Sequence, residues 1–352
     1  MFYLAVLAPL LRPLFKVLGV SDNVGAFILA HPWYGFSLYD IIMPMFIFMS
    51  GAALPLALGR RLTDKGRVGR EFHRYVWGRV MLLWMLGMCI QGNLLALDPL
   101  VFSPYNNTLQ AIAVGYVVTA YVLMIRSRWI QFAMPLGLLA AYGIWMHFGG
   151  DYTKTGNATV PVERMILGAL LPSGSRIVAH VGNDGYTWFL PSFVFPAIAL
   201  AGAHSTQLLR SGFTARRKAV VLALSGATML GAGLILEALG VKTVKHIFTV
   251  SFTLQSIGWC VLALFVLYVA TDIMRWRWGS GPLLLFGQYA LVAYLCESFF
   301  REVCLVLSKR LFSGVARVVP SGWGDVVIAI GFGLIVVTVL VIRRQLREGG
   351  SK

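Results

Sequence analysis

The sequence predicts an all-α protein, a polytopic bundle of about ten transmembrane helices. Of its 352 residues, 58% are hydrophobic and only 12% are charged, whereas soluble domains carry about 25% charged residues. The mean hydropathy is +0.76, and apolar runs of roughly 20 residues, enough to cross a bilayer, recur along the chain. Because no linker, repeat or low-complexity segment divides it, we expect a single transmembrane domain over residues 1–352.

The expected spans follow the apolar runs in order. They lie near residues 1–18, 37–58, 80–97, 108–125, 129–147, 188–208, 219–239, 248–270, 282–302 and 325–342. The first is interrupted by Arg12 and Pro13, which leaves about ten apolar residues for a hydrocarbon layer of roughly 30 Å, at about 1.5 Å per residue. This segment is either re-entrant or the end of a helix that begins upstream of Met1. We expect the second, an incomplete first span, because the distribution of cations requires an even number of crossings with a cytoplasmic start.

Topology accounts for the net charge of +16. Nineteen of the 30 Lys and Arg residues fall on one expected face: Arg60, Arg61, Lys65, Arg67, Arg70, Arg74, Arg79, Arg126, Arg128, Arg210, Arg216, Arg217, Lys218, Arg275, Arg277, Arg343, Arg344, Arg347 and Lys352. The opposite loops 21–36 and 98–107 contain none. Since Lys and Arg accumulate in cytoplasmic loops, we expect both termini in the cytoplasm and residues 30–36 on the outer face. Nucleic-acid binding is not expected.

Asp40 is an acid inside the second expected span. A charge there costs roughly 2.5–3.5 kcal/mol on insertion scales, so it is a functional candidate by default. Pro44 follows four residues later and has no N–H, so it would leave the Asp40 carbonyl without its helical partner. The alternative is that Asp40 only occupies the first turn, where the helix dipole favours an acid.

His31 and Trp33 precede this span on the expected outer face. A neutral imidazole can act as a general base near pH 7, although a lone loop histidine is more often only solvated. Trp33, with Tyr34 and Phe36 beside it, forms either an interfacial aromatic belt or a platform for a sugar ring. The residues alone do not choose between these alternatives.

More polar residues gather at the same ends of four later spans. They are Asn106, Asn107 and Gln110 at the fourth span, Asp184 and Trp188 at the sixth, Lys245 and Ser251 at the eighth, and Glu297 in the ninth. Helix ends always collect polar residues, so each is a weak signal, but together they predict one polar cavity open to the outside. The sequence shows no P-loop, dinucleotide fingerprint, GxSxG elbow or metal-ligand cluster, so no metal is expected.

Five stretches occur in an order and spacing shared with a known family. AHPWYGFSLYDIIMPMFIFMSG (30–51) carries a His, Trp, Gly, Asp, Pro pattern, and it is followed by TLQAIAVGY (108–116), NDGYTWFLPSFVFPAIALAG (183–202), KHIFTVSF (245–252) and GQYALVAYL (287–295). Together they resemble the heparan-α-glucosaminide N-acetyltransferase family of membrane acyltransferases and its bacterial relatives. The resemblance covers most of the chain and implies a bacterial cytoplasmic membrane as the location.

The resemblance implies an enzyme that moves an acetyl group from cytoplasmic acetyl-CoA, as co-substrate, to the amine of a glucosamine-type sugar or glycan at an outward-facing site. It makes His31 the base or acetyl carrier, with Asp40 orienting the imidazole or holding the sugar. Amide donors would stabilise the oxyanion, and a lysine would pair with a CoA phosphate or with the substrate. The implied binding residues are Trp33, Asn106, Asn107, Gln110, Asp184, Trp188 and Glu297 for the acceptor, and Lys245 and Ser251 for CoA.

The chain departs from the family pattern at several positions. His31 is one residue closer to its tryptophan than in better-known members, Ala111 replaces a basic residue, and Tyr289 replaces an asparagine. Two alternatives therefore stay open. One is a transporter or flippase for a sugar or lipid-linked substrate, with Asp40 and Glu297 binding substrate or protons; the other is an inactive member of the family. The sequence leaves the oligomeric state open, with a homodimer among the alternatives.

Overall fold

A computed structural model of the chain describes residues 8–20, 28, 32–58, 69–183, 186–276 and 280–349. All regular secondary structure in these ranges is helical, which confirms the predicted fold class. Six of the described helices are long and apolar enough to cross a membrane, as an integral membrane protein requires. The predicted total of about ten spans is not confirmed.

The six long helices coincide with six of the predicted spans. They are η2 with α3 (Leu38–Ile41 and Ile42–Leu58), α6 (Arg128–Gly149), η4 with α9 (Leu190–Phe193 and Phe195–Leu209), α10 (Ala215–Ala238), α11 with η5 (Val250–Tyr268 and Val269–Ile273) and α15 (Gly324–Gly349). A long apolar run is therefore sufficient to locate each of them. The η5 segment is a π-helical turn that extends α11.

The other four predicted spans take different forms. Residues 8–18 form α1 (Ala8–Leu18), which contains Pro13. The third prediction, 80–97, falls on α4 (Arg70–Ile90), which starts ten residues earlier with a charged first half. The fourth is α5 (Thr108–Val122), which has only 15 residues. The ninth, 282–302, is interrupted at Tyr289 into α12 (Ser280–Gln288) and α13 (Ala290–Ser298).

The chain divides into two compact units, which we describe separately. The smaller unit contains α1, residues 37–39 and α12 to α15, with α14 spanning Arg301–Val318. In its core, Phe332, Val336 and Leu340 of α15 pack with Phe286 and Cys304. The larger unit contains residues 32–36 and 40–275. That both units serve one functional domain stays a prediction.

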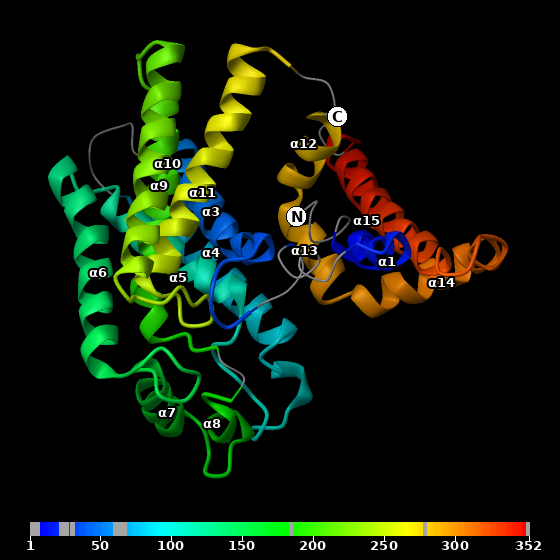
Figure 1. The fold of residues 1–352 in the computed structure, drawn as a ribbon, viewed down its shortest axis with the longest axis horizontal. Coiled ribbons are helices and arrows are strands. Elements are labelled where there is room, and N and C mark those ends of the chain that lie inside the picture. Colours follow the sequence, from blue (N-terminus) through cyan, green and yellow to red (C-terminus); the bar gives the residue numbers. More distant parts are fainter. Residues whose placement is uncertain are drawn as a thin grey trace. The chain divides into compact units, whose positions relative to one another are not determined.

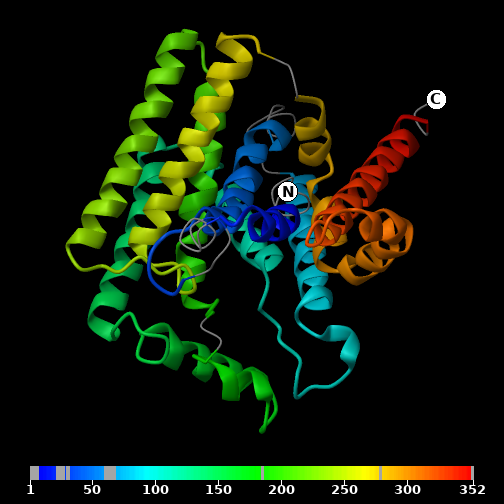
Figure 2. The ribbon, with the colours of Figure 1, turned by 45° about the vertical axis from the view of Figure 1, so that its right-hand side comes forward.

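At the centre of the larger unit, α3 packs against α9, with α5 beside both, and α10 lies alongside α11 (Figures 1 and 2). Glycines allow the closest approach. A Cβ atom on Gly51 of α3 would lie 1.9 Å from the Ala199 carbonyl oxygen, and one on Gly202 of α9 would lie 2.0 Å from the Phe48 carbonyl oxygen. Small residues of this kind let helix backbones pack directly against each other inside a membrane.

The helix ends of the larger unit sort into two groups. The starts of α3, α5, α9 and α11 and the last turns of α4, α6 and α10 meet at one end, and the short helices α7 (Thr159–Leu170) and α8 (Arg176–His180) lie beyond it (Figure 1). We call this the site end; it comprises residues 32–36, 40, 91–107, 150–183, 186–189 and 240–249 of the larger unit. The basic end lies opposite and carries Arg70, Arg74, Arg126, Arg128, Arg210, Arg216, Arg217 and Lys218.

Candidate functional site

A buried ion pair joins the starts of α3 and α11. Asp40 lies in the 3₁₀ turn η2, Lys245 lies in the turn before α11, and Lys245 Nζ is 3.0 Å from Asp40 Oδ1. Asp40 is 0% exposed and Lys245 is 5% exposed. Burial lowers the pKa of Lys245, and the Asp40 carboxylate opposes this decrease. The sequence marks both residues as candidates, but in separate roles, and their pairing is a finding of the structure.

Pro44 does not act as the sequence predicts. Since α3 begins at Ile42, Pro44 lies in its first turn, where backbone N–H groups have no partner within the helix in any case. The proline therefore does not remove an interior hydrogen bond from the Asp40 carbonyl. The position of Asp40 matches the alternative, an acid at the start of the helix, where the dipole favours a negative charge.

Five aromatic side chains form a continuous row across the site end. The Trp33 and His246 rings stack with their centroids 5.0 Å apart, and Tyr186 lies 4.3 Å from His246. Tyr186 then stacks on Trp188 at 5.7 Å, and Trp188 lies 5.7 Å from Tyr105. We call these five residues the aromatic row. It joins four separate segments of the chain. Trp33, His246 and Tyr186 are half-buried, whereas Trp188 and Tyr105 are buried.

Trp33 is held in place at one end of the row. Its Nε1 donates to the Tyr152 carbonyl oxygen at 2.8 Å, and the neighbouring Gly35 N–H donates to the Thr243 carbonyl oxygen at 2.8 Å. The exposed Lys154 ammonium lies 5.6 Å from the centroid of the Trp33 ring, within the range of a cation–π interaction. Trp33 is therefore a fixed, half-buried ring beside an accessible cation, which fits a binding platform better than a lipid-facing belt.

The predicted amide residues attach the start of α5 to the other end of the row. Asn106 Oδ1 accepts from Trp188 Nε1 at 3.1 Å, and Gln110 Oε1 accepts from the Asn106 N–H at 2.9 Å. Asn107 Oδ1 caps α5 by accepting from the Leu109 N–H at 2.7 Å, and its Nδ2 donates to Gln91 Oε1 at 2.8 Å. Asn107 and Gln110 are fully buried, so their observed role is to hold the turn that positions Asn106.

Lys245 and Ser251, which are predicted to bind CoA, are both buried. A phosphate needs accessible donors, but the Lys245 ammonium is paired with Asp40 and buried. The Ser251 hydroxyl is also buried, where it donates to the Lys242 carbonyl oxygen at 3.0 Å. Lys245 lies at the site end, and Ser251 lies in the first turn of α11 next to it. Their interactions instead fix the turn that carries His246.

Three other predicted site residues are not part of the described arrangement in the larger unit. His31 and Asp184 lie outside the described residues. Glu297 belongs to the smaller unit, near the end of α13, where the Ser298 hydroxyl donates to its carboxylate at 3.4 Å. Of the predicted residues at the site end, Trp33 and Trp188 belong to the aromatic row, Asn106 bonds to Trp188, and Asp40 and Lys245 form the ion pair.

Glu163 of α7 binds the backbone of the segment that carries Trp188, and this residue is not predicted from the sequence. Its carboxylate accepts from the Trp188 N–H, 3.1 Å from each oxygen, and from the Phe189 N–H at 3.0 Å. It is 2% exposed. Burial raises the pKa of Glu163 to about 7, and the hydrogen bonds from Phe189 and Trp188 limit the increase. The sequence feature that could have indicated a role for Glu163 is that it is the one acid in the mostly apolar helix TVPVERMILGAL.

Glu163 should make stability fall as the pH rises. Because its pKa is about 7 in the folded protein and 4.5 ordinarily, the folded state holds a proton in this interval that the unfolded chain has released. The resulting contribution to the free energy of unfolding is complete below about pH 4.5. It is lost as the pH rises through about 7, a change of about 3 kcal/mol. Unfolding midpoints in detergent between pH 4.5 and 8 should show this decrease in wild type and not in Glu163→Gln.

The matched control is Glu71→Gln, which changes an exposed glutamate of α4 and should retain the wild-type pH dependence. If Glu163→Gln shows the same decrease in midpoint as wild type, the titration belongs to another group. Since Glu163 holds the backbone of Trp188, the same series can be followed by tryptophan fluorescence.

Tyr105, Tyr186 and His246 are the three residues of the row that are absent from the predicted catalytic and binding residues. The Thr187 N–H donates to the His246 carbonyl oxygen at 3.4 Å, so the two segments are joined through their backbones as well as their rings. The sequence gives only a weak indication of these residues: His246 follows Lys245 directly, and Tyr186 is two residues before Trp188. Nothing in either spacing shows that these rings meet.

No family model matches the chain, and no curated protein matches it significantly. The resemblance to membrane N-acetyltransferases therefore remains an expectation from motif order. The function has to be argued from the site end itself, where an aromatic row and a buried ion pair lie at the ends of apolar helices.

Proposed function

We propose that this protein is an integral membrane N-acetyltransferase that moves an acetyl group from acetyl-CoA to the amine of a glucosamine-type sugar. The observation that carries the proposal is the half-buried part of the aromatic row, Trp33, His246 and Tyr186, beside an accessible cation, Lys154. The buried Trp188 continues the row to a half-buried amide, Asn106. Sugars bind through apolar ring faces and hydroxyl groups, and this row offers aromatic faces beside polar groups. The motif order of the sequence supports the same function.

The reaction needs a base near the row. The sugar nitrogen must lose a proton to attack the thioester carbonyl carbon; the C–S bond breaks as the C–N bond forms, and the thiolate of CoA leaves and takes up a proton. We assign the base to His31, two residues before Trp33, either as proton acceptor or as transient acetyl carrier. Asp40 and Lys245 would hold the start of α3 and the turn of His246 in fixed positions beside it.

The proposed orientation places the basic end in the cytoplasm and the site end outside. The eight cations that define the basic end support this choice, because Lys and Arg accumulate on the cytoplasmic side. Acetyl-CoA is then supplied from the side of the cations, and the acceptor from the side of the aromatic row. We place the protein in a bacterial cytoplasmic membrane because of the resemblance to the bacterial relatives of the acetyltransferase family.

Proteoliposomes test the proposal directly. Labelled acetyl-CoA is supplied on one side and glucosamine on the other, and N-acetylated sugar is measured. Wild type should transfer label, and His31→Ala should lower the rate by about 100-fold or more, as expected for loss of a general base. Trp33→Leu should raise KM about 10-fold with a smaller change in kcat, because it removes part of the platform.

The control is Trp129→Leu, which changes a tryptophan that is 86% exposed at the start of α6, at the basic end, and should leave both constants unchanged. The proposal fails if wild type transfers no acetyl group, or if His31→Ala transfers as much as wild type. Size-exclusion profiles of each variant separate loss of activity from loss of folding.

A transporter is the second candidate, and the Asp40–Lys245 pair is the observation that favours it. Ionisable groups within spans are typical of proton or substrate pathways. The same vesicles without acetyl-CoA distinguish the two functions. Uptake of unmodified labelled glucosamine, with no acetylated product in the presence of acetyl-CoA, would replace the acyltransferase by a transporter.

A further inference from the structure

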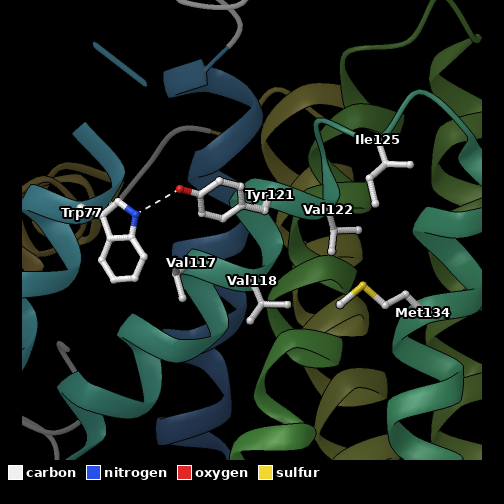
Figure 3. A pocket seen from close by; sticks show the side chains of 7 residues that line it. All are labelled: Trp77, Val117, Val118, Tyr121, Val122, Ile125 and Met134. Carbon is white, nitrogen blue, oxygen red and sulfur yellow. Dashed lines mark hydrogen bonds between the residues drawn. The ribbon is translucent and has the colours of Figure 1, made fainter. Parts of the chain in front are cut away.

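An apolar groove lies on the larger unit between α4, α5 and α6, far along these helices from the aromatic row. Figure 3 shows Trp77 and Tyr121 on one side, Met134 on the other and valines between them. The groove is lined by Trp77, Val117, Val118, Tyr121, Val122, Ile125 and Met134. These residues come from the first half of α4, the last turns of α5 with the residues that follow it, and the first turns of α6. The groove therefore lies near the basic end.

The polar groups at this groove are paired with each other. Trp77 Nε1 donates to the Tyr121 hydroxyl oxygen at 3.0 Å, and His73 Nδ1 lies 2.9 Å from the same oxygen. The Phe72 and Tyr121 rings also make an edge contact at 5.8 Å. The lining that remains is almost entirely hydrocarbon, which suits an acyl chain and disfavours a sugar or a peptide.

Exposed arginines border the groove where it opens. Arg126 directly follows Ile125, and Arg128 is the first residue of α6. On the opposite wall, Arg74 is three residues before Trp77, so both lie on the same face of α4. An apolar channel that ends among cations is complementary to an acyl chain that ends in a negative phosphate.

We propose that this groove binds one acyl chain of an anionic phospholipid, whose phosphate is held by Arg126 and Arg128. The site is independent of the proposed transferase activity. Basic residues between transmembrane helices attract anionic headgroups, and the apolar groove fixes the chain below them. A zwitterionic lipid with the same chains fills the groove equally well but gains little from the arginines.

Lipid binding to the delipidated, full-length protein tests this assignment. Phosphatidylglycerol and phosphatidylcholine with identical chains are titrated separately, and bound lipid is counted by native mass spectrometry. Phosphatidylglycerol should saturate one site about 10-fold more tightly than phosphatidylcholine. Arg126→Gln/Arg128→Gln should remove this preference, and Val118→Phe, which narrows the groove, should weaken binding of both lipids.

The matched control is Arg216→Gln/Arg217→Gln, which removes two charges from the start of α10, another helix at the basic end. It should retain the preference for phosphatidylglycerol. Equal affinity for the two lipids in wild type overturns the proposal, and so does an equal loss of preference in both double variants, because net charge alone would then explain binding. All substituted arginines are exposed, so folding of the variants is expected and is checked by thermal unfolding.

Discussion

Replacing Lys245 with methionine should destabilise the protein by about 3–5 kcal/mol, the cost of leaving one member of a buried ion pair without the other. The Asp40 carboxylate would stay 0% exposed after losing the ammonium 3.0 Å away. The double variant Asp40→Leu/Lys245→Met replaces both charges by apolar groups of similar size, so most of the stability should return. Unfolding in mixed detergent micelles measures all four members of this double-mutant cycle.

The surface pair Arg344–Glu348 is the internal control. Its atoms approach to 2.8 Å, but its side chains are 56% and 63% exposed, and Glu348→Gln should change stability little, because exposed pairs contribute little. If Lys245→Met costs no more than Glu348→Gln, the pair does not hold the starts of α3 and α11. If the double variant is stable but transfers no acetyl group, the charges are needed for activity rather than for folding.

Placing a methyl group between α3 and α9 should cost about 3 kcal/mol at either contact glycine. In Gly51→Ala the new Cβ would lie 1.9 Å from the Ala199 carbonyl oxygen, and in Gly202→Ala it would lie 2.0 Å from the Phe48 carbonyl oxygen. Both obstacles are backbone atoms, so no side-chain rotation relieves the overlap and the helices must separate. The double variant should cost less than the sum, because one separation accommodates both methyl groups.

Gly137→Ala in α6 and Gly231→Ala in α10 are the controls, since a Cβ at either position meets nothing within 4 Å. These substitutions should be neutral or slightly stabilising, because alanine favours helix. Thermal unfolding in detergent compares all the variants. If the control variants lose as much stability as Gly51→Ala, the effect is due to helix propensity and not to the contact between α3 and α9.

Much of the helical framework was predictable from the sequence. Six long apolar runs located six long helices, because a bilayer-length hydrophobic segment has few alternatives to a helix. The start of α4 at Arg70 was missed because a charged segment was interpreted as a loop, although Arg and Glu are good helix formers. The break at Tyr289 was missed because apolar content does not change across it.

The candidate site was only partly predictable. Asp40 was found because a charge in an apolar span is rare, and Asn106 and Trp188 because they open apolar spans. Their partners depend on which helix ends meet, which no spacing along one segment reveals. The pairing of Asp40 with Lys245, 205 positions later in the numbering, and the stacking of Trp33 on His246 arise from helix packing, so neither could be predicted.

The length of α5 has a consequence for depth. With 15 residues, it extends about 22 Å, whereas α6 beside it has 22 residues and extends about 33 Å. When their ends at the basic end are level, the start of α5 stops roughly 10 Å short of the end of α6. In a bilayer whose hydrophobic thickness matched α6, the Asn106–Trp188 contact would then lie below the surface of the hydrocarbon layer, and a thinner bilayer would shorten the path that water takes to reach it.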